Sequence, residues 1–128
     1  PRFTFPPKIL INMIKKNKLR CGIAIKPKTS FKVLEKYLPF IDYIVVMSVE
    51  PGLGGQGFIP STLEKISSID KNLKEKNLRD QIAIQVDGGI KLHNAKEVIN
   101  AGADILVSGS EVFKSENPSE TINKMYSL

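Results

Sequence analysis

Glycine is concentrated in one short segment of this chain. The sequence VVMSVEPGLGGQGF places Gly52, Gly54, Gly55 and Gly57 within six positions, directly after an apolar run. Glycine loses more backbone entropy on folding than any other residue, so a loop that keeps several glycines is costly to order. Such a loop is typical of a site where the backbone approaches another group closely, and we expect a ligand here.

Two further glycine turns follow apolar runs later in the chain. They contain Gly88 and Gly89 in VDGGI, and Gly109 and Ser110 in VSGSEVF. Each turn runs toward a predicted helix start, where backbone N–H groups and the helix dipole favour an anion. A single Gly-Gly pair more often makes only a tight turn. Two such turns in succession favour a phosphate site.

A carboxylate, Asp87, stands at the end of a predicted buried strand. Its position is costly unless the group is paired, hydrogen-bonded or bound to a metal. Asp87 is therefore the strongest candidate for acid–base catalysis or metal ligation. The alternative is that Asp87 caps its own turn. The only histidine in the sequence, His93, lies past this turn, and we expect it to be exposed to solvent.

The elements that must position these residues alternate along the chain. Apolar runs, several of them rich in β-branched residues, predict strands at 21–25, 43–49, 82–86 and 104–109, and the second reads as covered on both faces. Helical spacing of apolar residues predicts helices near 9–14, 30–38, 63–73, 95–101 and from 117, the third begun by a Ser61–Glu64 capping box. This alternation predicts a parallel α/β sheet flanked by helices, whose sites form at the carboxyl ends of the strands.

The composition fits one modest globular domain. The 128 residues are 41% hydrophobic and 25% charged, and no apolar run approaches the roughly 20 residues that span a bilayer. The net charge of +6 comes from scattered lysines without interleaved aromatic residues, which argues against nucleic acid as a partner. Cys21 is the only cysteine; we expect it to be a buried small hydrophobe in a cytoplasmic protein.

Several segments together closely resemble the ribulose-phosphate 3-epimerase family. They are VMSVEPGLGGQGF, VDGGI, AGADILVSGSEVF and GIAIKPKT, and the resemblance runs from about Cys21 to Phe113. It implies a TIM (β/α)8 barrel and a divalent metal (Zn, Fe, Mn or Co). The implied reaction interconverts D-ribulose 5-phosphate and D-xylulose 5-phosphate, a step of the pentose phosphate pathway, by metal-assisted proton transfer at C3.

The resemblance also implies residue roles. Asp87 matches a carboxylate that both ligates the metal and acts as one catalytic acid/base, and Met47 matches a methionine beside the reacting part of the sugar. The mobile loop that closes over the substrate is matched by Gly52, Leu53, Gly54 and Gly55. The backbone that grips the phosphate is matched by Gly88, Gly89, Gly109 and Ser110.

The sequence departs from the family in extent. Its predicted strands match only the carboxyl-terminal half of the barrel, so residues 1–128 are predicted to form one partial barrel domain whose amino-terminal half is absent. The absent half would bring the second catalytic aspartate, two histidine ligands and another aspartate ligand. We therefore expect an incomplete metal site and little or no epimerase activity from the chain alone.

A half-barrel leaves two open strand edges, which invite pairing. The expected partner is the missing half or a second copy in a homo-oligomer. The chain starts at Pro1 and not at a methionine, which we interpret as processing or as an absent upstream part. Two alternative functions remain: a non-catalytic half-barrel that binds sugar phosphates, and an epimerase of another ketose phosphate such as allulose 6-phosphate.

Overall fold

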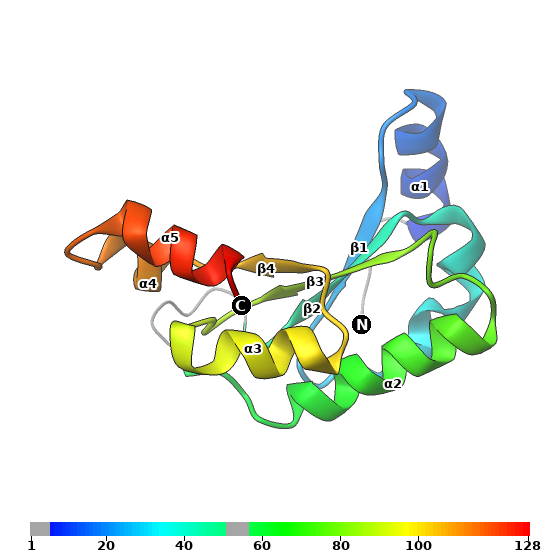
Figure 1. Ribbon diagram of the computed structural model, residues 1–128. Coiled ribbons are helices and arrows are strands. Elements are labelled where there is room, and N and C mark those ends of the chain that lie inside the picture. Colours follow the sequence, from blue (N-terminus) through cyan, green and yellow to red (C-terminus); the bar gives the residue numbers. More distant parts are fainter. Residues whose placement is uncertain (1–5, 51–56) are drawn as a thin grey trace.

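Helices and strands alternate along the chain, as the sequence predicts (Figure 1). The computed structural model describes residues 6–50 and 57–128. The elements are α1 (Pro7–Lys16), β1 (Gly22–Ile25), the 3-10 helix η1 (Phe31–Phe40), β2 (Tyr43–Met47), α2 (Thr62–Glu75), β3 (Ala83–Asp87), α3 (Leu92–Ala101), β4 (Ile105–Val107), α4 (Ser110–Phe113) and α5 (Pro118–Tyr126). Within the described ranges, every helix is too short or too polar to cross a bilayer.

The strands form one parallel sheet in the order β1-β2-β3-β4. Consecutive strands are therefore neighbours, each joined to the next by a helical crossover, as in a segment of a TIM barrel. The register places Met47 of β2 opposite Asp87 of β3, and Asp87 opposite Val107 of β4. All four carboxyl ends lie at one edge of the sheet.

Helices cover only one face of the sheet (Figure 1). On the covered face of the two central strands, the side chains are fully buried: they are Ile44, Val46, Ile84 and Val86. They share one hydrophobic core with Ile66, Ile69 and Leu73 of α2 and with Ala95 and Val98 of α3. Alternate residues, such as Val45 and Gln85, stay partly exposed on the other face. The prediction that the second strand is covered on both faces is therefore wrong for the described part of the chain.

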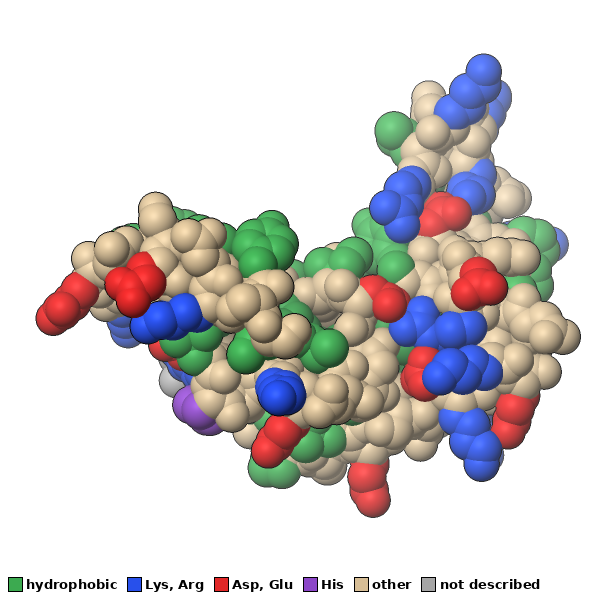
Figure 2. Space-filling model, viewed as in Figure 1, with side chains coloured by type: hydrophobic (Ala, Val, Ile, Leu, Met, Phe, Trp, Pro, Cys, Tyr) green, Lys and Arg blue, Asp and Glu red, His purple; other side chains and the backbone are tan. Residues whose placement is uncertain are grey.

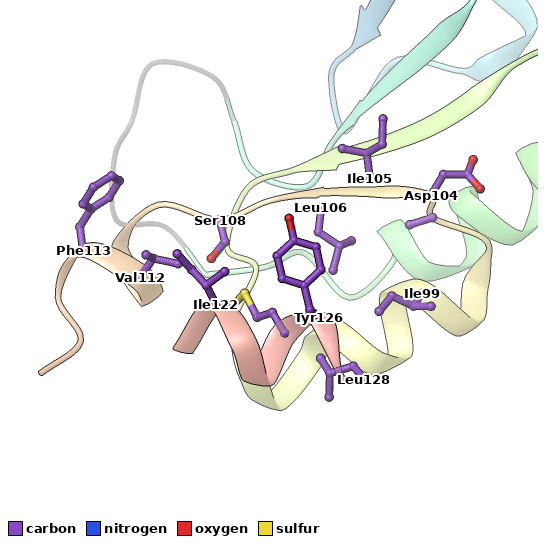
Figure 3. Close-up of a pocket in the computed structure, with 12 residues that line it drawn as sticks. Ile99, Asp104, Ile105, Leu106, Ser108, Val112, Phe113, Ile122, Tyr126 and Leu128 are labelled. Carbon is purple, nitrogen blue, oxygen red and sulfur yellow. The ribbon is translucent and has the colours of Figure 1, made fainter. Parts of the chain in front are cut away.

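The uncovered side of the molecule is hollowed between α1 and α5, with hydrophobic side chains in the hollow (Figure 2). Beside β4 lies an apolar groove of about 690 Å³ (Figure 3). Its lining includes Ile105, Phe113, Ile122 and Tyr126. The side chains of Phe113 and Tyr126 are 84% and 87% exposed, so a large apolar surface meets solvent at this end.

Three local predictions differ from the structure. The second helix is a 3-10 helix that continues through Pro39 to Phe40, instead of ending before the proline. The predicted capping box at Ser61 is wrong: Ser61 is itself helical in conformation and its side chain makes no capping hydrogen bond. The single-turn helix α4 after the second glycine turn was not predicted.

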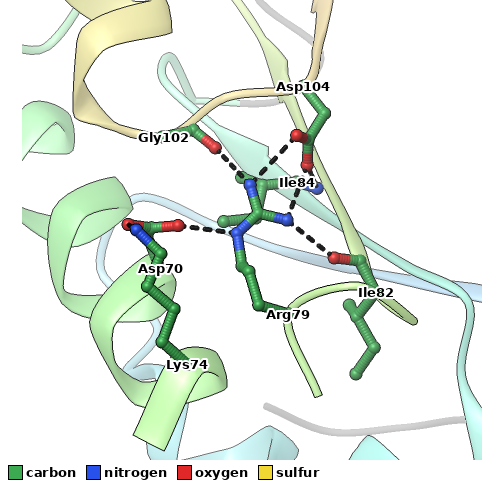
Figure 4. A network of polar contacts seen from close by, with 7 residues as sticks. All are labelled: Asp70, Lys74, Arg79, Ile82, Ile84, Gly102 and Asp104. Atoms are coloured by element: carbon green, nitrogen blue, oxygen red, sulfur yellow. Dashed lines mark hydrogen bonds and ion pairs between the residues drawn. The ribbon is translucent and has the colours of Figure 1, made fainter. Parts of the chain in front are cut away.

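Arg79 ties together the amino ends of β3 and β4 and helix α2 (Figure 4). Its Nε donates to Asp70 Oδ1 at 2.6 Å, and its Nη1 and Nη2 donate to the carbonyls of Ile82 and Gly102 at 3.0 and 2.9 Å. It also pairs with Asp104, whose Oδ2 accepts from the Ile84 N–H at 2.7 Å. One planar guanidinium therefore satisfies two carboxylates and two carbonyls, which lysine cannot do.

Asp42 makes a similar connection at the amino ends of β1 and β2. Its Oδ2 accepts from the Cys21 N–H at 2.7 Å and from Lys15 Nζ at 2.9 Å, so it joins α1, β1 and β2. The hydrogen bond from the Cys21 amide, and then that from Lys15, hold the pKa of Asp42 below its ordinary value of 3.8. Cys21 is buried, as expected, and burial followed by the Asp42 charge raises the pKa of its thiol.

Replacing Arg79 with alanine is expected to lower the free energy of unfolding by about 2 kcal/mol, because two carboxylates and two carbonyls lose a charged donor. The matched control is Lys74→Ala, which removes a 65% exposed partner of the same Asp70 and should cost about 0.5 kcal/mol or less. Urea unfolding of both variants measures the difference. Equal losses would contradict the central role of Arg79.

Acidification provides a second test. Because the pKa of Asp42 is lower in the folded than in the unfolded chain, its contribution to stability is complete above the unfolded pKa. That contribution is lost as the pH falls through the folded pKa. The Asp42→Asn variant should therefore be less stable than the parent at neutral pH, with the difference shrinking below about pH 4. Thermal unfolding between pH 3 and 7 measures this, with the exposed Asp80→Asn as control.

Candidate functional site

The carboxyl ends of β2 and β3 bring Met47 and Asp87 side by side. The two residues are direct partners in the parallel register. Both fall on the uncovered face of the sheet, since burial alternates along each strand and both are partly exposed. The structure thus joins an acid–base candidate to the neighbouring apolar side chain at the edge where sites of such folds form.

The Asp87 carboxylate makes no hydrogen bond or ion pair with any residue in the described part of the chain. The alternative prediction, in which Asp87 caps its own turn, is therefore not realised. A partly exposed carboxylate with no structural partner is available to a proton, a metal or a substrate. Nothing in the described structure requires an aspartate at this position for folding.

Ser48 holds the ends of β2 and β3 together and was missed by the sequence analysis. Its side chain is fully buried, and its hydroxyl donates to the carbonyl of Gly88. Its N–H donates to the Asp87 carbonyl at 2.9 Å, and its carbonyl accepts from Ile59 N–H at 2.9 Å. The only signal in the sequence is a polar residue within the apolar run VVMSV, which indicates a buried polar contact but not its partner.

Backbone conformation and packing require glycine in the first turn but not in the second. Gly88 and Gly89 have φ angles of +126° and +67°, which disfavour other residues. A Cβ on Gly89 would lie 2.5 Å from the Phe58 backbone N, so the end of the glycine-rich segment packs on this turn. Around Gly57 and Gly109, a Cβ would meet nothing within 4 Å. The turn conformation and its packing account for glycine at positions 88 and 89, whereas the fold gives no steric reason for Gly109.

Side chains link the two turns. Lys91 Nζ donates to Ser110 Oγ at 2.6 Å, and Ser108 Oγ donates to the Ile90 carbonyl at 3.1 Å. The Leu92 N–H donates to Glu111 Oε2 at 3.2 Å. The residues predicted to grip phosphate therefore lie on two turns that are held against each other. The backbone N–H groups of Gly88, Gly89, Gly109 and Ser110 donate no hydrogen bond to the described residues, so they remain available as anion donors.

Other predicted residues lie elsewhere. His93 is exposed on the first turn of α3, as expected. The loop glycines Gly52, Gly54 and Gly55, together with Leu53, fall outside the described residues. Two residues lie between the first turn and α3, which begins at Leu92, and α4, which follows the second turn, is only one turn long.

A divalent-metal site is not complete in the described part of the chain. Nowhere in residues 6–50 and 57–128 do three His, Cys, Asp or Glu side chains cluster as ligands. Protein sites for zinc and similar ions use three or four such ligands. Asp87 alone does not meet that requirement, so the donors present do not fit a resident metal ion.

Comparison with known proteins identifies close sequence relatives. A profile of the Ribulose-phosphate 3 epimerase family matches residues 4–113. Ribulose-phosphate 3-epimerase of Chlamydia pneumoniae is 44% identical over 110 residues, which cover 86% of this chain and 48% of that protein. The protein of the same name from Escherichia coli K12 is 37% identical over 117 residues, covering 91% and 51%. The chain thus spans about half the length of these curated relatives.

Solved structures share the fold at lower sequence identity. A 3-hexulose-6-phosphate synthase superposes with a TM-score of 0.63 at 12% identity, covering 92% of this chain and 53% of that one. A flavocytochrome b2 variant superposes with a TM-score of 0.66 at 19% identity, covering 96% and 32%. At such identities the likeness concerns the fold alone, that of four consecutive βα units of a TIM barrel.

Replacing Gly89 with alanine is expected to lower the free energy of unfolding by about 2 kcal/mol, because a Cβ at this φ is strained and collides with the Phe58 backbone. Gly57→Ala is the matched control, since its Cβ would enter open space. Urea unfolding compares the two variants, and amide NMR reports whether Phe58 moves. A Gly89→Ala variant as stable as the control would show that the two loops do not pack as described.

Proposed function

The chain belongs to the ribulose-phosphate 3-epimerase family, and we propose that it supplies the carboxyl-terminal half of such an epimerase. The reaction is the interconversion of D-ribulose 5-phosphate and D-xylulose 5-phosphate, a step of the pentose phosphate pathway. In this proposal residues 1–128 form one partial barrel domain that holds the phosphate and one acid/base group. We also propose a cytoplasmic location, because the only cysteine in the sequence is buried and unpaired, as suits a reducing compartment.

The observation that carries the proposal is the row formed by Met47 and Asp87, with the glycine turns directly after β3 and β4. In the proposed complex, the backbone N–H groups of Gly88, Gly89, Gly109 and Ser110 bind the phosphate, and Met47 contacts the carbon chain of the sugar. Asp87 then removes or returns the C3 proton on one face of the substrate. Gly52, Leu53, Gly54 and Gly55 are proposed as the substrate loop on the family resemblance alone.

Epimerisation needs two acid/base groups, one on each face of the substrate. The proposed site of this chain supplies only the first of them, Asp87. The family's divalent metal (Zn, Fe, Mn or Co) would likewise need ligands beyond Asp87, because the described donors do not fit it. Both requirements point to groups outside the described site. In this proposal the chain therefore binds the phosphate of the substrate and carries out one of the two proton transfers.

The open edges of the sheet support a completing partner. The outer edges of β1 and β4 pair with no strand in the described structure, and the apolar groove beside β4 is uncovered. A unit of four further strands and their helices would bury these surfaces and close an eight-stranded barrel. The partner is either a complementary amino-terminal half or a second copy of this chain in a homo-oligomer.

One observation favours a second candidate function. Residues 6–50 and 57–128 bring together no three metal-ligating side chains, which fits a half-barrel that binds sugar phosphates without catalysing their epimerisation. The turns and Asp87 also suit other ketose phosphates, such as allulose 6-phosphate. The turns would bind the phosphate, and Asp87 would act on a carbon next to a carbonyl, and other ketose phosphates have both groups.

A fusion tests the proposal: the amino-terminal half of the Escherichia coli relative, joined to this chain. With ribulose 5-phosphate in D2O and a divalent metal, the fusion should exchange the C3 proton, as followed by NMR. Asp87→Asn in the fusion should slow exchange by about 100-fold or more. The chain alone should bind the substrate with little or no exchange.

Each outcome of this experiment separates the candidates. Undiminished exchange in the Asp87→Asn fusion would remove Asp87 from catalysis. Binding without exchange in every form would favour the non-catalytic alternative. Faster exchange with allulose 6-phosphate than with ribulose 5-phosphate would change the substrate.

A further inference from the structure

One ammonium group lies between the two glycine turns. Lys91 follows the first turn by two residues, and its Nζ reaches across to Ser110 Oγ of the second turn at 2.6 Å. From the sequence, Lys91 is one of the scattered lysines on the polar sides of helical patterns, which predicts a plain solvated position. The structure instead places its charge on the second turn, in contact with the Ser110 hydroxyl.

The Lys91 ammonium has no carboxylate partner. No ion pair in the described part of the chain involves Lys91, although Glu111 is close enough for its Oε2 to accept from the Leu92 N–H. A neutral hydroxyl is a weaker acceptor for an ammonium than a charged group is. An anion would therefore be a stronger hydrogen-bond acceptor for the Lys91 ammonium than its present partner, the Ser110 hydroxyl.

Hydrogen bonds to Asn94 fix the backbone of Lys91 against the first turn. The Lys91 N–H donates to Asn94 Oδ1 at 2.8 Å, and Asn94 Nδ2 donates to the Gly89 carbonyl at 2.9 Å. Asn94 is buried, so it anchors the first turn to the start of α3. The flexible lysine stem extends from this anchored point with two N–H donors still unused.

We propose that Lys91 is a phosphate-binding residue whose ammonium passes from the Ser110 hydroxyl to the phosphate group of the substrate. This inference rests on the proposed function, because it concerns the same phosphate site. The backbone N–H groups of the turns supply directional donors, and Lys91 supplies the full positive charge that the short helix α4 does not. A partly exposed ammonium also makes the affinity depend on salt.

The experiment is a titration of the chain with inorganic phosphate at fixed ionic strength, followed by the amide NMR signals of Gly88, Gly89, Gly109 and Ser110. Lys91→Gln should weaken phosphate binding roughly tenfold and flatten its salt dependence, since one charge-assisted hydrogen bond is lost. Lys91→Arg keeps the charge and should retain most of the affinity. Lys96→Gln is the matched control, because it removes an exposed lysine from α3, the helix that Lys91 precedes.

The outcomes distinguish this inference from the proposed function. Phosphate shifts in the parent chain that persist with equal affinity in Lys91→Gln would overturn the role of Lys91 and leave the phosphate site intact. If Lys91→Gln and Lys96→Gln weaken phosphate binding equally, the effect comes from net charge alone, and the proposed role of Lys91 is overturned. A parent chain whose turn amides do not respond to phosphate would overturn both proposals. Unchanged dispersion of the remaining amide signals confirms that each variant is folded.

Discussion

The register of the parallel sheet is the constraint on which the rest of this structure depends. At the amino end of the sheet, Asp42 and Asp104 each accept the N–H of a residue in the preceding βα unit at 2.7 Å, and each is held by a cation. Because a shift of one residue would exchange the two faces of a strand, these carboxylates decide which side chains reach the open face. At the opposite end, Ser48 joins β2 to β3 through the carbonyls of Asp87 and Gly88. Met47 and Asp87 are thus neighbours because the sheet is fastened at both ends.

One face of the sheet is covered by helices in the described structure, and the other face is not (Figure 1). The buried faces of β2 and β3 share a core with α2 and α3, which provides the hydrophobic stabilisation. The face that carries Asp87 has no such cover in the described structure, and apolar side chains at both ends of the hollow meet solvent. Folding and chemistry are therefore separated by face: one side stabilises the chain, and the other presents groups that need a partner.

The sequence was informative where function depends on residue type and order. Alternating apolar runs and helical patterns predicted the parallel βα architecture, and the position of Asp87 after a strand predicted a carboxylate at the site edge. The capping box at Ser61 was wrong because the chain enters α2 through the turn at Ile59 and Pro60, whose carbonyls satisfy the first amides. The Lys91–Ser110 and Ser48–Gly88 contacts join residues far apart in the chain, and local patterns carry no signal of such pairing.

The two open edges of the sheet are unlike, and this determines the geometry of any self-association. One edge is β1, near the basic helix α1, and the other is β4, near the apolar groove. A contact that joins β4 of one molecule to β1 of the next is head-to-tail, so it closes into a ring only if the rotation between molecules allows it. Two molecules with the curvature of a barrel would close at eight strands. With any flatter arrangement, each added molecule would leave the same two edges exposed, and the product would be a growing filament.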